Sequence, residues 1–246
     1  ILLSDVPSVV FRTFPHTENK MKIIKNTTRL TNEILKQRLS CIPVYLPITD
    51  SIKDLSVEVN VKNTTDQIIY VTTKDFKIRH KSTGKYLNDS EQHRIFPADP
   101  ISKNYILFAR LRPGIDKESG EELSFTADFD VGTAKQNGMF SVVSMSSFTN
   151  TLDPIKIAAA WKKESETGIE KYTSGGEKIS KEELELYKQN WLHLEGQRHY
   201  MENSFDFKIE TIGTYNNVEL VVKSCENMNE KLSDLYKKCD TNTLKI

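Results

Sequence analysis

Two stretches of the chain alternate strictly between apolar and polar positions. In the first, Val57, Val59 and Val61 are separated by polar residues. The apolar positions of the second stretch are Leu123, Phe125, Ala127, Phe129 and Val131. A period of two puts alternate side chains on opposite faces of a strand. The pattern therefore predicts a mostly antiparallel β module between Ser51 and about Ser147.

Two short strands are expected before this module. Residues 8–14 are rich in β-forming side chains and follow Pro7, and residues 21–25 form the second candidate. Such runs, bounded by turn residues, are typical of strands. Because they are close in the sequence, we expect these two strands to pair with each other.

A short helix is predicted directly after the second strand. Thr31 is a suitable N-cap, and Leu30 before it and Leu35 four residues after it have the spacing of a hydrophobic staple. Pro43 marks the latest point at which this helix can end.

A second helix is predicted from the S-x-x-E capping box at residues 180–183. It is expected to run to about residue 194. Its apolar positions recur three or four residues apart, at Leu184, Tyr187, Trp191 and Leu194. This spacing gives the helix one apolar face, and Trp191 is expected to anchor it to a neighbouring element.

The longest helix is predicted at the end of the chain. Phe205, Phe207 and Ile209 alternate with polar residues in a strand that ends at Gly213, and Asn216 or Asn217 caps the helix that follows. Its apolar positions are Val218, Val221, Val222, Cys225, Met228, Leu232, Leu235, Tyr236 and Cys239. These span roughly 22 residues, or about 33 Å. Either they pack on the protein's own sheet, or a partner helix lies along the excess length.

Charge and hydropathy exclude two classes of function. The 246 residues contain 34 basic and 34 acidic side chains, so no net field steers the chain toward phosphate. Autonomous, tight nucleic-acid binding is therefore not expected. No apolar run approaches the ~20 residues that span a bilayer, so no membrane role is expected.

The cysteines and histidines form no recognisable metal or catalytic motif. Cys41, Cys225 and Cys239 have no C-x-x-C spacing, which fits a reducing interior compartment better than a disulfide framework or a zinc site. His193 and His199 lie six residues apart, which is not a zinc-binding spacing. The sequence also lacks a G-x-S-x-G elbow.

Two acidic residues offer the only candidate for a cation site. Asp128 and Asp130 are two apart on a predicted strand, so their carboxylates share a face that suits a hard cation. The alternative is a pair of solvated carboxylates on the outer face. A metal-dependent enzyme built on these residues and the histidines is one rival hypothesis, although nothing in the sequence completes a coordination shell.

One segment carries a family resemblance. Residues 26–44 resemble the motif of the RNA polymerase alpha/D family, which comprises the bacterial alpha, archaeal D-type and eukaryotic third subunits. The residues that carry the likeness are Asn26, Thr28, Glu33, Arg38, Leu39, Ile42 and Pro43. Weaker matches follow the same order at residues 1–11, 109–114 with the loop at 132–141, and 207–213.

The resemblance implies an α+β fold and a role in transcription. A split dimerisation domain of antiparallel strands and long helices, residues 1–48 and 149–246 with its first helix truncated, is expected to be interrupted by an inserted, mostly-β domain at residues 49–148. Members of this family are non-catalytic assembly subunits of DNA-directed RNA polymerase. By this resemblance, the protein is expected to heterodimerise with an eleven/L-type partner, or a fused partner half, and to form the platform for the second-largest and largest subunits.

The resemblance also implies which residues meet partners. The expected dimer interface consists of Leu2, Leu3, Val218, Val221, Val222, Cys225, Met228 and Leu232. The loop with Lys135, Gln136 and Asn137 is expected to contact the second-largest subunit. Some relatives carry a cysteine cluster in or beside the insert, but residues 49–149 contain no cysteine, so no cofactor is expected.

An intracellular location follows from this resemblance. The protein is expected with the polymerase, in the nucleus of a eukaryotic cell, or in the host cytoplasm or virion if it is viral. The lysine- and asparagine-rich composition resembles that of subunits encoded by large cytoplasmic DNA viruses. A β-rich module that binds a protein or ligand, without any polymerase role, is the second rival hypothesis.

Overall fold

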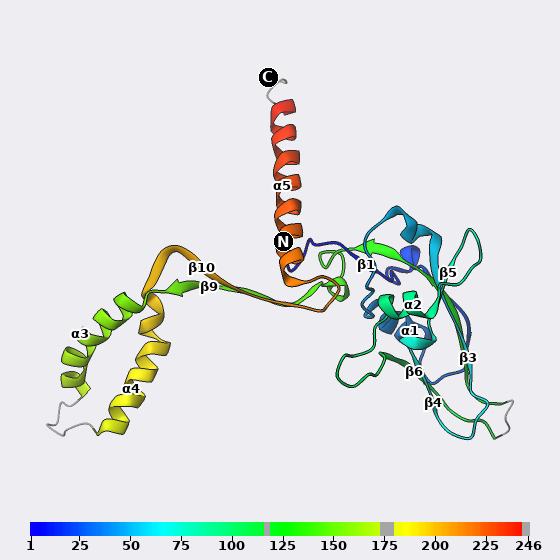
Figure 1. Cartoon of the computed structure of the whole chain (residues 1–246), viewed down its shortest axis with the longest axis horizontal. Coiled ribbons are helices and arrows are strands. Elements are labelled where there is room, and N and C mark those ends of the chain that lie inside the picture. Colours follow the sequence, from blue (N-terminus) through cyan, green and yellow to red (C-terminus); the bar gives the residue numbers. More distant parts are fainter. Residues whose placement is uncertain (116–118, 173–179, 243–246) are drawn as a thin grey trace. The chain divides into compact units, whose positions relative to one another are not determined.

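The computed structural model describes residues 1–115, 119–172 and 180–242, and for residues 167–172 and 240–242 only the backbone (Figure 1). Helices and antiparallel strand pairs are mixed along the chain, which confirms the α+β class. The chain forms two compact units. Unit 1 consists of Ile1–Met145 and Glu210–Ile246, and unit 2 is Ser146–Ile209. The division into a split dimerisation domain and an insert stays a prediction.

The centre of unit 1 is a four-stranded sheet. Its strands, in spatial order, are β2 (Met21–Asn26), β7 (Glu122–Asp128), β3 (Leu55–Lys62) and β5 (Lys77–His80). In the antiparallel β3–β7 pair, Val57 lies opposite Ala127 and Val59 opposite Phe125, and all four side chains are buried. The alternating pattern of the sequence therefore predicted these two strands and their buried face correctly.

The expected pairing of the two N-terminal strands was wrong. β1 (Ser8–Val10) pairs with β8 (Asp130–Gly132), whereas β2 pairs with β7. The partner of each strand lies more than 90 residues further along the chain, so closeness in the sequence did not decide the pairing. Every residue of β1 is buried, whereas β2 forms the edge of its sheet.

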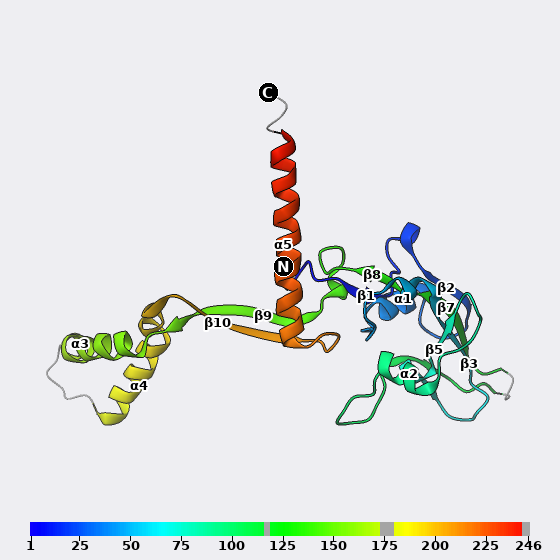
Figure 2. The same cartoon turned by 45° about the horizontal axis from the view of Figure 1, so that its top comes forward.

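Two more strands, two helices and four 3₁₀ helices of unit 1 surround the four-stranded sheet. β4 (Ile69–Thr72) and β6 (Leu107–Leu111) form a separate antiparallel pair. The helices α1 (Asn32–Ser40) and α2 (Asp89–Ile95) lie on one side of the four-stranded sheet in both views (Figures 1 and 2). The 3₁₀ helices are η1 (His16–Glu18), η2 (Asp50–Asp54), η3 (Thr73–Asp75) and η4 (Gly138–Phe140).

The cap of α1 was predicted from the sequence, and α2 was not. The Thr31 hydroxyl accepts a hydrogen bond from the Ile34 amide at 3.4 Å, as its type and position indicated. α2 has a capping box between Asn88 and Glu91. At seven residues this helix is too short to show an apolar period in the sequence.

Phenylalanine rings fill the core of unit 1. Phe76 meets the edges of three rings, those of Phe96, Phe108 and Phe125, with centroids 5.5–5.8 Å apart. Phe11, beyond the end of β1, stacks on Phe129 at 5.0 Å. These rings come from strands and connections throughout the first half of the chain, so their packing joins those segments in one core.

Unit 2 has little core of its own. It contains the helices α3 (Pro154–Tyr172), α4 (Lys181–His193) and η5 (Glu195–Arg198), and parts of β9 (Val143–Leu152) and β10 (Tyr200–Thr211), which pair. The capping box of α4 is present as predicted, between Ser180 and Glu183. Among the described residues of this unit, Trp191 is the only buried apolar side chain.

Truncating a core side chain of the central sheet should destabilise unit 1 selectively. Ile78 in β5 is fully buried, so Ile78→Ala should cost about 2–5 kcal/mol. Ile24 in β2 is 61% exposed, and Ile24→Ala should change stability by less than about 1 kcal/mol. Both tryptophans lie in unit 2, so amide hydrogen exchange of β3 and β7 in urea is the appropriate measurement. Equal effects of the two variants would contradict the assigned core.

Candidate functional site

The helix α5 (Asn217–Asn242) begins after a tight turn. Gly213 has φ 101°, a conformation that side chains with a Cβ rarely adopt, and it follows the end of β10. The Asn216 side chain then accepts a hydrogen bond from the Glu219 amide at 2.8 Å and caps the helix. With 26 residues, α5 is about 39 Å long at 1.5 Å per residue.

One face of α5 is fixed to the N-terminal segment of unit 1. Leu220 and Ser224 are buried on this face. Further along it, the Asn227 amide donates to the Asp5 carbonyl oxygen at 2.7 Å, and Lys231 Nζ lies 2.9 Å from the Asp5 carboxylate. These contacts repeat every three to four residues, as expected for a single helix face.

Another side of α5 carries exposed apolar residues, which we call the α5 stripe. Its members are Val218, Val221, Val222, Cys225, Met228, Leu232, Leu235, Tyr236 and Cys239. Val218, Val222 and Leu232 are 75%, 50% and 56% exposed. The sequence left two alternatives open for these apolar positions. Because they are exposed, the first alternative, packing on the protein's own sheet, is wrong.

The spacing within the α5 stripe is that of a coiled-coil seam. Seven of its members alternate three and four residues apart, from Val218 to Cys239. The order is Val218, Val221, Cys225, Met228, Leu232, Leu235 and Cys239. A regular alternation of three and four keeps an apolar seam directed at a neighbouring helix, which is a more specific property than the apolar face expected from the sequence.

The N-terminal residues of the expected interface lie in a turn. The amides of Ser4 and Asp5 donate to the Ile1 carbonyl oxygen at 3.0 and 2.8 Å. Leu3 is 55% exposed and Leu2 is partly buried. Through Asp5, this turn is bonded to Asn227 and Lys231, which lie on a different face of α5 from the α5 stripe.

The loop expected to contact the second-largest subunit is held in place by unit 1. The Lys135 amide donates to the Ser4 carbonyl oxygen at 2.8 Å, and the Gln136 side chain accepts from Arg12 at 3.2 Å. Asn137 caps η4 by accepting from the Met139 amide. Lys135 is exposed and has no ion pair among the described residues, so its charge faces solvent on a fixed loop.

Arg12 connects this loop to the strands below it. Its guanidinium donates to the Asp130 carboxylate at 2.6 Å and to the Val131 carbonyl oxygen at 2.9 Å. Burial by itself would raise the pKa of Asp130, but the hydrogen bonds from Arg12 and Lys20 outweigh burial and lower it. Asp130 is therefore the anionic partner of two cations in this arrangement.

The residues that carry the resemblance at residues 26–44 form a structural network around α1. The Asn26 side chain accepts from the Thr28 amide and donates to the Leu30 carbonyl oxygen, which fixes the turn before α1. Leu39 and Ile42 are buried. Arg38 donates to the carbonyl oxygens of Leu107 and Phe108 in β6, both at 2.7 Å.

The other two motif residues lie at the ends of α1. Glu33 is exposed in the first turn of α1, and Pro43 is partly buried just beyond the helix. The likeness at residues 26–44 thus covers a turn, a helix and its connection to a neighbouring strand.

The candidate cation site does not assemble. Asp128 pairs with Lys81 at 3.3 Å, whereas Asp130 pairs with Arg12 and Lys20. Throughout the described ranges, no three His, Cys, Asp or Glu residues come together as a metal site. The metal-dependent enzyme hypothesis thus gains no support from the geometry.

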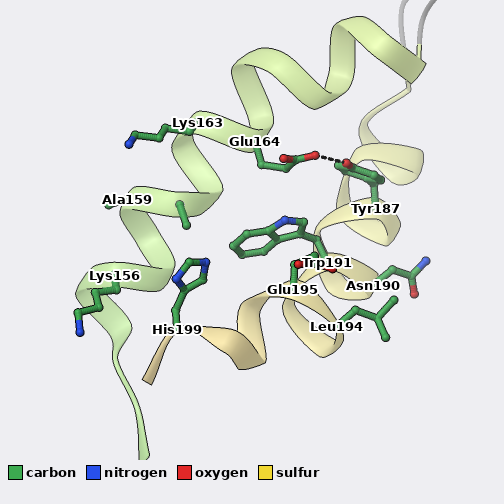
Figure 3. Close-up of a pocket in the computed structure, with 11 residues that line it drawn as sticks. Lys156, Ala159, Lys163, Glu164, Tyr187, Asn190, Trp191, Leu194, Glu195 and His199 are labelled. Carbon is green, nitrogen blue, oxygen red and sulfur yellow. Dashed lines mark hydrogen bonds between the residues drawn. The ribbon is translucent and has the colours of Figure 1, made fainter. Parts of the chain in front are cut away.

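Unit 2 contains a pocket that the sequence did not predict (Figure 3). It has a volume of about 820 Å³ and lies between α3 and α4. Trp191 occupies its centre, with the His199 ring stacked on it at a centroid distance of 6.2 Å. The Trp161 ring of α3 also packs against Trp191, with centroids 5.4 Å apart. The Tyr187 hydroxyl donates to Glu164 at 2.6 Å.

The signal for α3 was present but weak. Among the side chains of α3 that the structure describes, those of Ile157, Ala160, Trp161, Glu164 and Ser165 are partly buried, and their three- to four-residue spacing is that of one helix face. None of the residues that line the pocket pairs a nucleophile with a base, so the arrangement fits packing between the two helices.

The attachment of α5 should be sensitive to acid. Hydrogen bonds from Lys231 and then from the Ser4 hydroxyl lower the pKa of Asp5. A carboxyl group whose pKa is lower in the folded state stabilises the fold at pH values above its unfolded-state pKa of about 3.9. This stabilisation is lost as the pH falls through the folded-state pKa. Lys231→Gln should raise the pKa of Asp5 in an NMR carboxyl titration.

Asp99 is the internal control for this titration. Its pKa is lowered by hydrogen bonds from Ser102, so it should not change in the Lys231→Gln variant. An unchanged pKa at Asp5 would contradict the assigned contact.

Comparison with known proteins identifies no family for this chain. No protein-family model matches the sequence, and no curated protein matches it significantly. Within the described part of the chain, no helix has both the length and the apolar character needed to cross a bilayer. The α5 stripe is a continuous row of exposed apolar side chains along one helix.

Proposed function

We propose that this protein is a non-catalytic assembly subunit of a multisubunit DNA-directed RNA polymerase. Through the α5 stripe it pairs with an eleven/L-type subunit, or with a fused equivalent, and the pair forms a platform for the second-largest and largest subunits. The exposed, regularly spaced stripe is the observation that carries the proposal. Nucleotidyl transfer belongs to the large subunits.

The physical case for pairing rests on the apolar area that α5 leaves in water. The Val, Met and Leu side chains of the α5 stripe are 42–75% exposed, and burial of such surface contributes roughly 25 cal/mol per Å². Single exposed apolar residues are common on monomers, but a continuous row along one helix is typical of a protein-binding surface. The α5 stripe fits a role in which this row is covered.

A helix is the occupant that best fits the stripe. Knobs-into-holes packing requires apolar side chains at alternating intervals of three and four, and the stripe keeps this alternation for three heptads. Asn227 and Lys231 meanwhile hold the other face of α5 against Asp5, so pairing requires no rearrangement of the helix. A preformed surface lowers the entropic cost of association.

The polymerase assignment rests on the resemblance at residues 26–44. In support of it, these residues form one connected element, in which Asn26 fixes the turn and Arg38 bonds the helix to β6. Lys135 is proposed to present its charge to the second-largest subunit. The protein then resides where its polymerase does, in the nucleus of a eukaryotic cell or in the host cytoplasm or virion for a virus.

Affinity purification of the natural full-length protein from its source tests this function. The expected result is co-purification of the two largest RNA polymerase subunits in stoichiometric amounts, identified by mass spectrometry. A monomer that carries neither large subunit would refute the polymerase role and favour a β-rich binding module.

A charge placed in the α5 stripe should abolish pairing. Met228→Asp buries a carboxylate in the interface, which costs several kcal/mol when the carboxylate is unpaired. Ser233→Asp places the same charge on α5 outside the stripe and should leave pairing intact. Co-purification of the partner with each variant is the measurement. Pairing that survives Met228→Asp would exclude α5 as the interface.

A further inference from the structure

Unit 1 has a second surface feature, which is separate from the α5 stripe. Among the described residues that line a pocket of about 370 Å³, four are arginines, Arg29, Arg38, Arg110 and Arg112, and one is acidic, Glu121. We call it the arginine pocket. Four positive charges and one negative charge leave a formal surplus of +3. The arginines come from the segment before α1, from α1 itself and from β6 with the residue that follows it.

Two of these arginines are fixed by contacts within unit 1. Arg38 donates through Nε and one terminal nitrogen to the Phe108 and Leu107 carbonyl oxygens, both at 2.7 Å. The Arg110 guanidinium lies over the Tyr70 ring, 5.6 Å from its centroid. Carbonyl groups and an aromatic face orient these guanidinium groups without neutralising their charge.

The other two arginines have no partner in the described part of the chain. Neither Arg29 nor Arg112 makes an ion pair or a side-chain hydrogen bond there. The Glu121 carboxylate accepts a hydrogen bond from the Arg112 backbone amide at 2.8 Å, and within the described ranges it forms no ion pair with either guanidinium group. Two guanidinium forks therefore remain available at the pocket.

Some exposed cations elsewhere on unit 1 are paired with acids. Lys25 lies 2.7 Å from Glu122, and Lys81 lies 3.3 Å from Asp128. The chain has equal numbers of basic and acidic residues, so the surplus at the pocket is local. Like charges held close together repel one another, and a bound anion relieves that repulsion.

The apolar residues that line the arginine pocket indicate which class of anion fits it. Leu30, Phe108 and the 49% exposed Ile68 line it beside the arginines. Free phosphate has no apolar part to cover these side chains, and a chain of zero net charge has no field that attracts nucleic acid. An acidic peptide with an apolar residue uses both kinds of surface, because guanidinium forks match carboxylates and the apolar wall takes the other side chain.

We propose that the arginine pocket binds a short acidic segment of a partner protein. Carboxylates of the segment pair with Arg29 and Arg112, and a neighbouring apolar side chain packs against Leu30 and Ile68. The volume is near the lower end of the ~300–1,000 Å³ typical of ligand pockets, so the site accepts a few side chains. This inference does not depend on the polymerase role, since it rests on a different surface.

Fluorescence anisotropy with the whole chain tests the proposal. The probes are a panel of fluorescein-labelled heptapeptides that combine two or three glutamates or aspartates with leucine or phenylalanine, each with a matched peptide in which glutamine or asparagine replaces the acid. At least one acidic peptide should bind ten times or more as tightly as its matched peptide. The Arg29→Gln/Arg112→Gln variant should lose this preference.

Two controls make the result decisive. The Arg94→Gln/Lys74→Gln variant also removes two exposed positive charges, but outside the pocket, and should bind like the unaltered chain. Circular dichroism should show the same folded signal for both variants. Failure of every acidic peptide to bind preferentially overturns the proposal, and so does retained preference in the Arg29→Gln/Arg112→Gln variant. Binding of inorganic pyrophosphate without binding of peptides would identify a phosphate site and also overturn it.

Discussion

The packing of phenylalanine rings around Phe76 is the constraint on which unit 1 depends. Phe76 lies between β4 and β5, and its three ring neighbours come from the end of α2, from β6 and from β7. Aromatic side chains bury large areas, and edge-to-face contacts at these distances fix their orientation. The four-stranded sheet, the β4–β6 pair and α2 are therefore held in a common core. The positions of α1 and the arginine pocket follow, because Arg38 is bonded to β6.

Local patterns in the sequence predicted several elements correctly. Strands β3 and β7 followed from their period of two, and α1 and α4 followed from their caps at Thr31 and Ser180, because these signals arise within a few residues of each other. The apolar positions of α5 were also predicted from the sequence, but the exposure of their side chains to solvent was not. The pairing of β1 with β8 joins segments that are over 100 residues apart, which no local pattern encodes.

The candidate sites show the same limit. Asp128 and Asp130 are close in sequence and point to a cation site, yet the fold supplies each with basic partners from distant segments. By contrast, Arg29 and Arg112 lie far apart in the sequence, yet both line the arginine pocket. Electrostatic pairing depends on tertiary contacts, so a sequence indicates the charges but not which of them remain uncompensated.

The ends of unit 2 are neighbours, because β9 leads into it and β10 leads out of it, and these two strands pair. When the two ends of a segment lie on adjacent paired strands, residues can be added to or removed from the segment without changing the distance between the residues that flank it. Residues between β9 and β10 are therefore a place where evolution can lengthen or shorten the chain while the strand pair persists. The same geometry makes this hairpin a suitable position for genetic insertion of a fluorescent or affinity label.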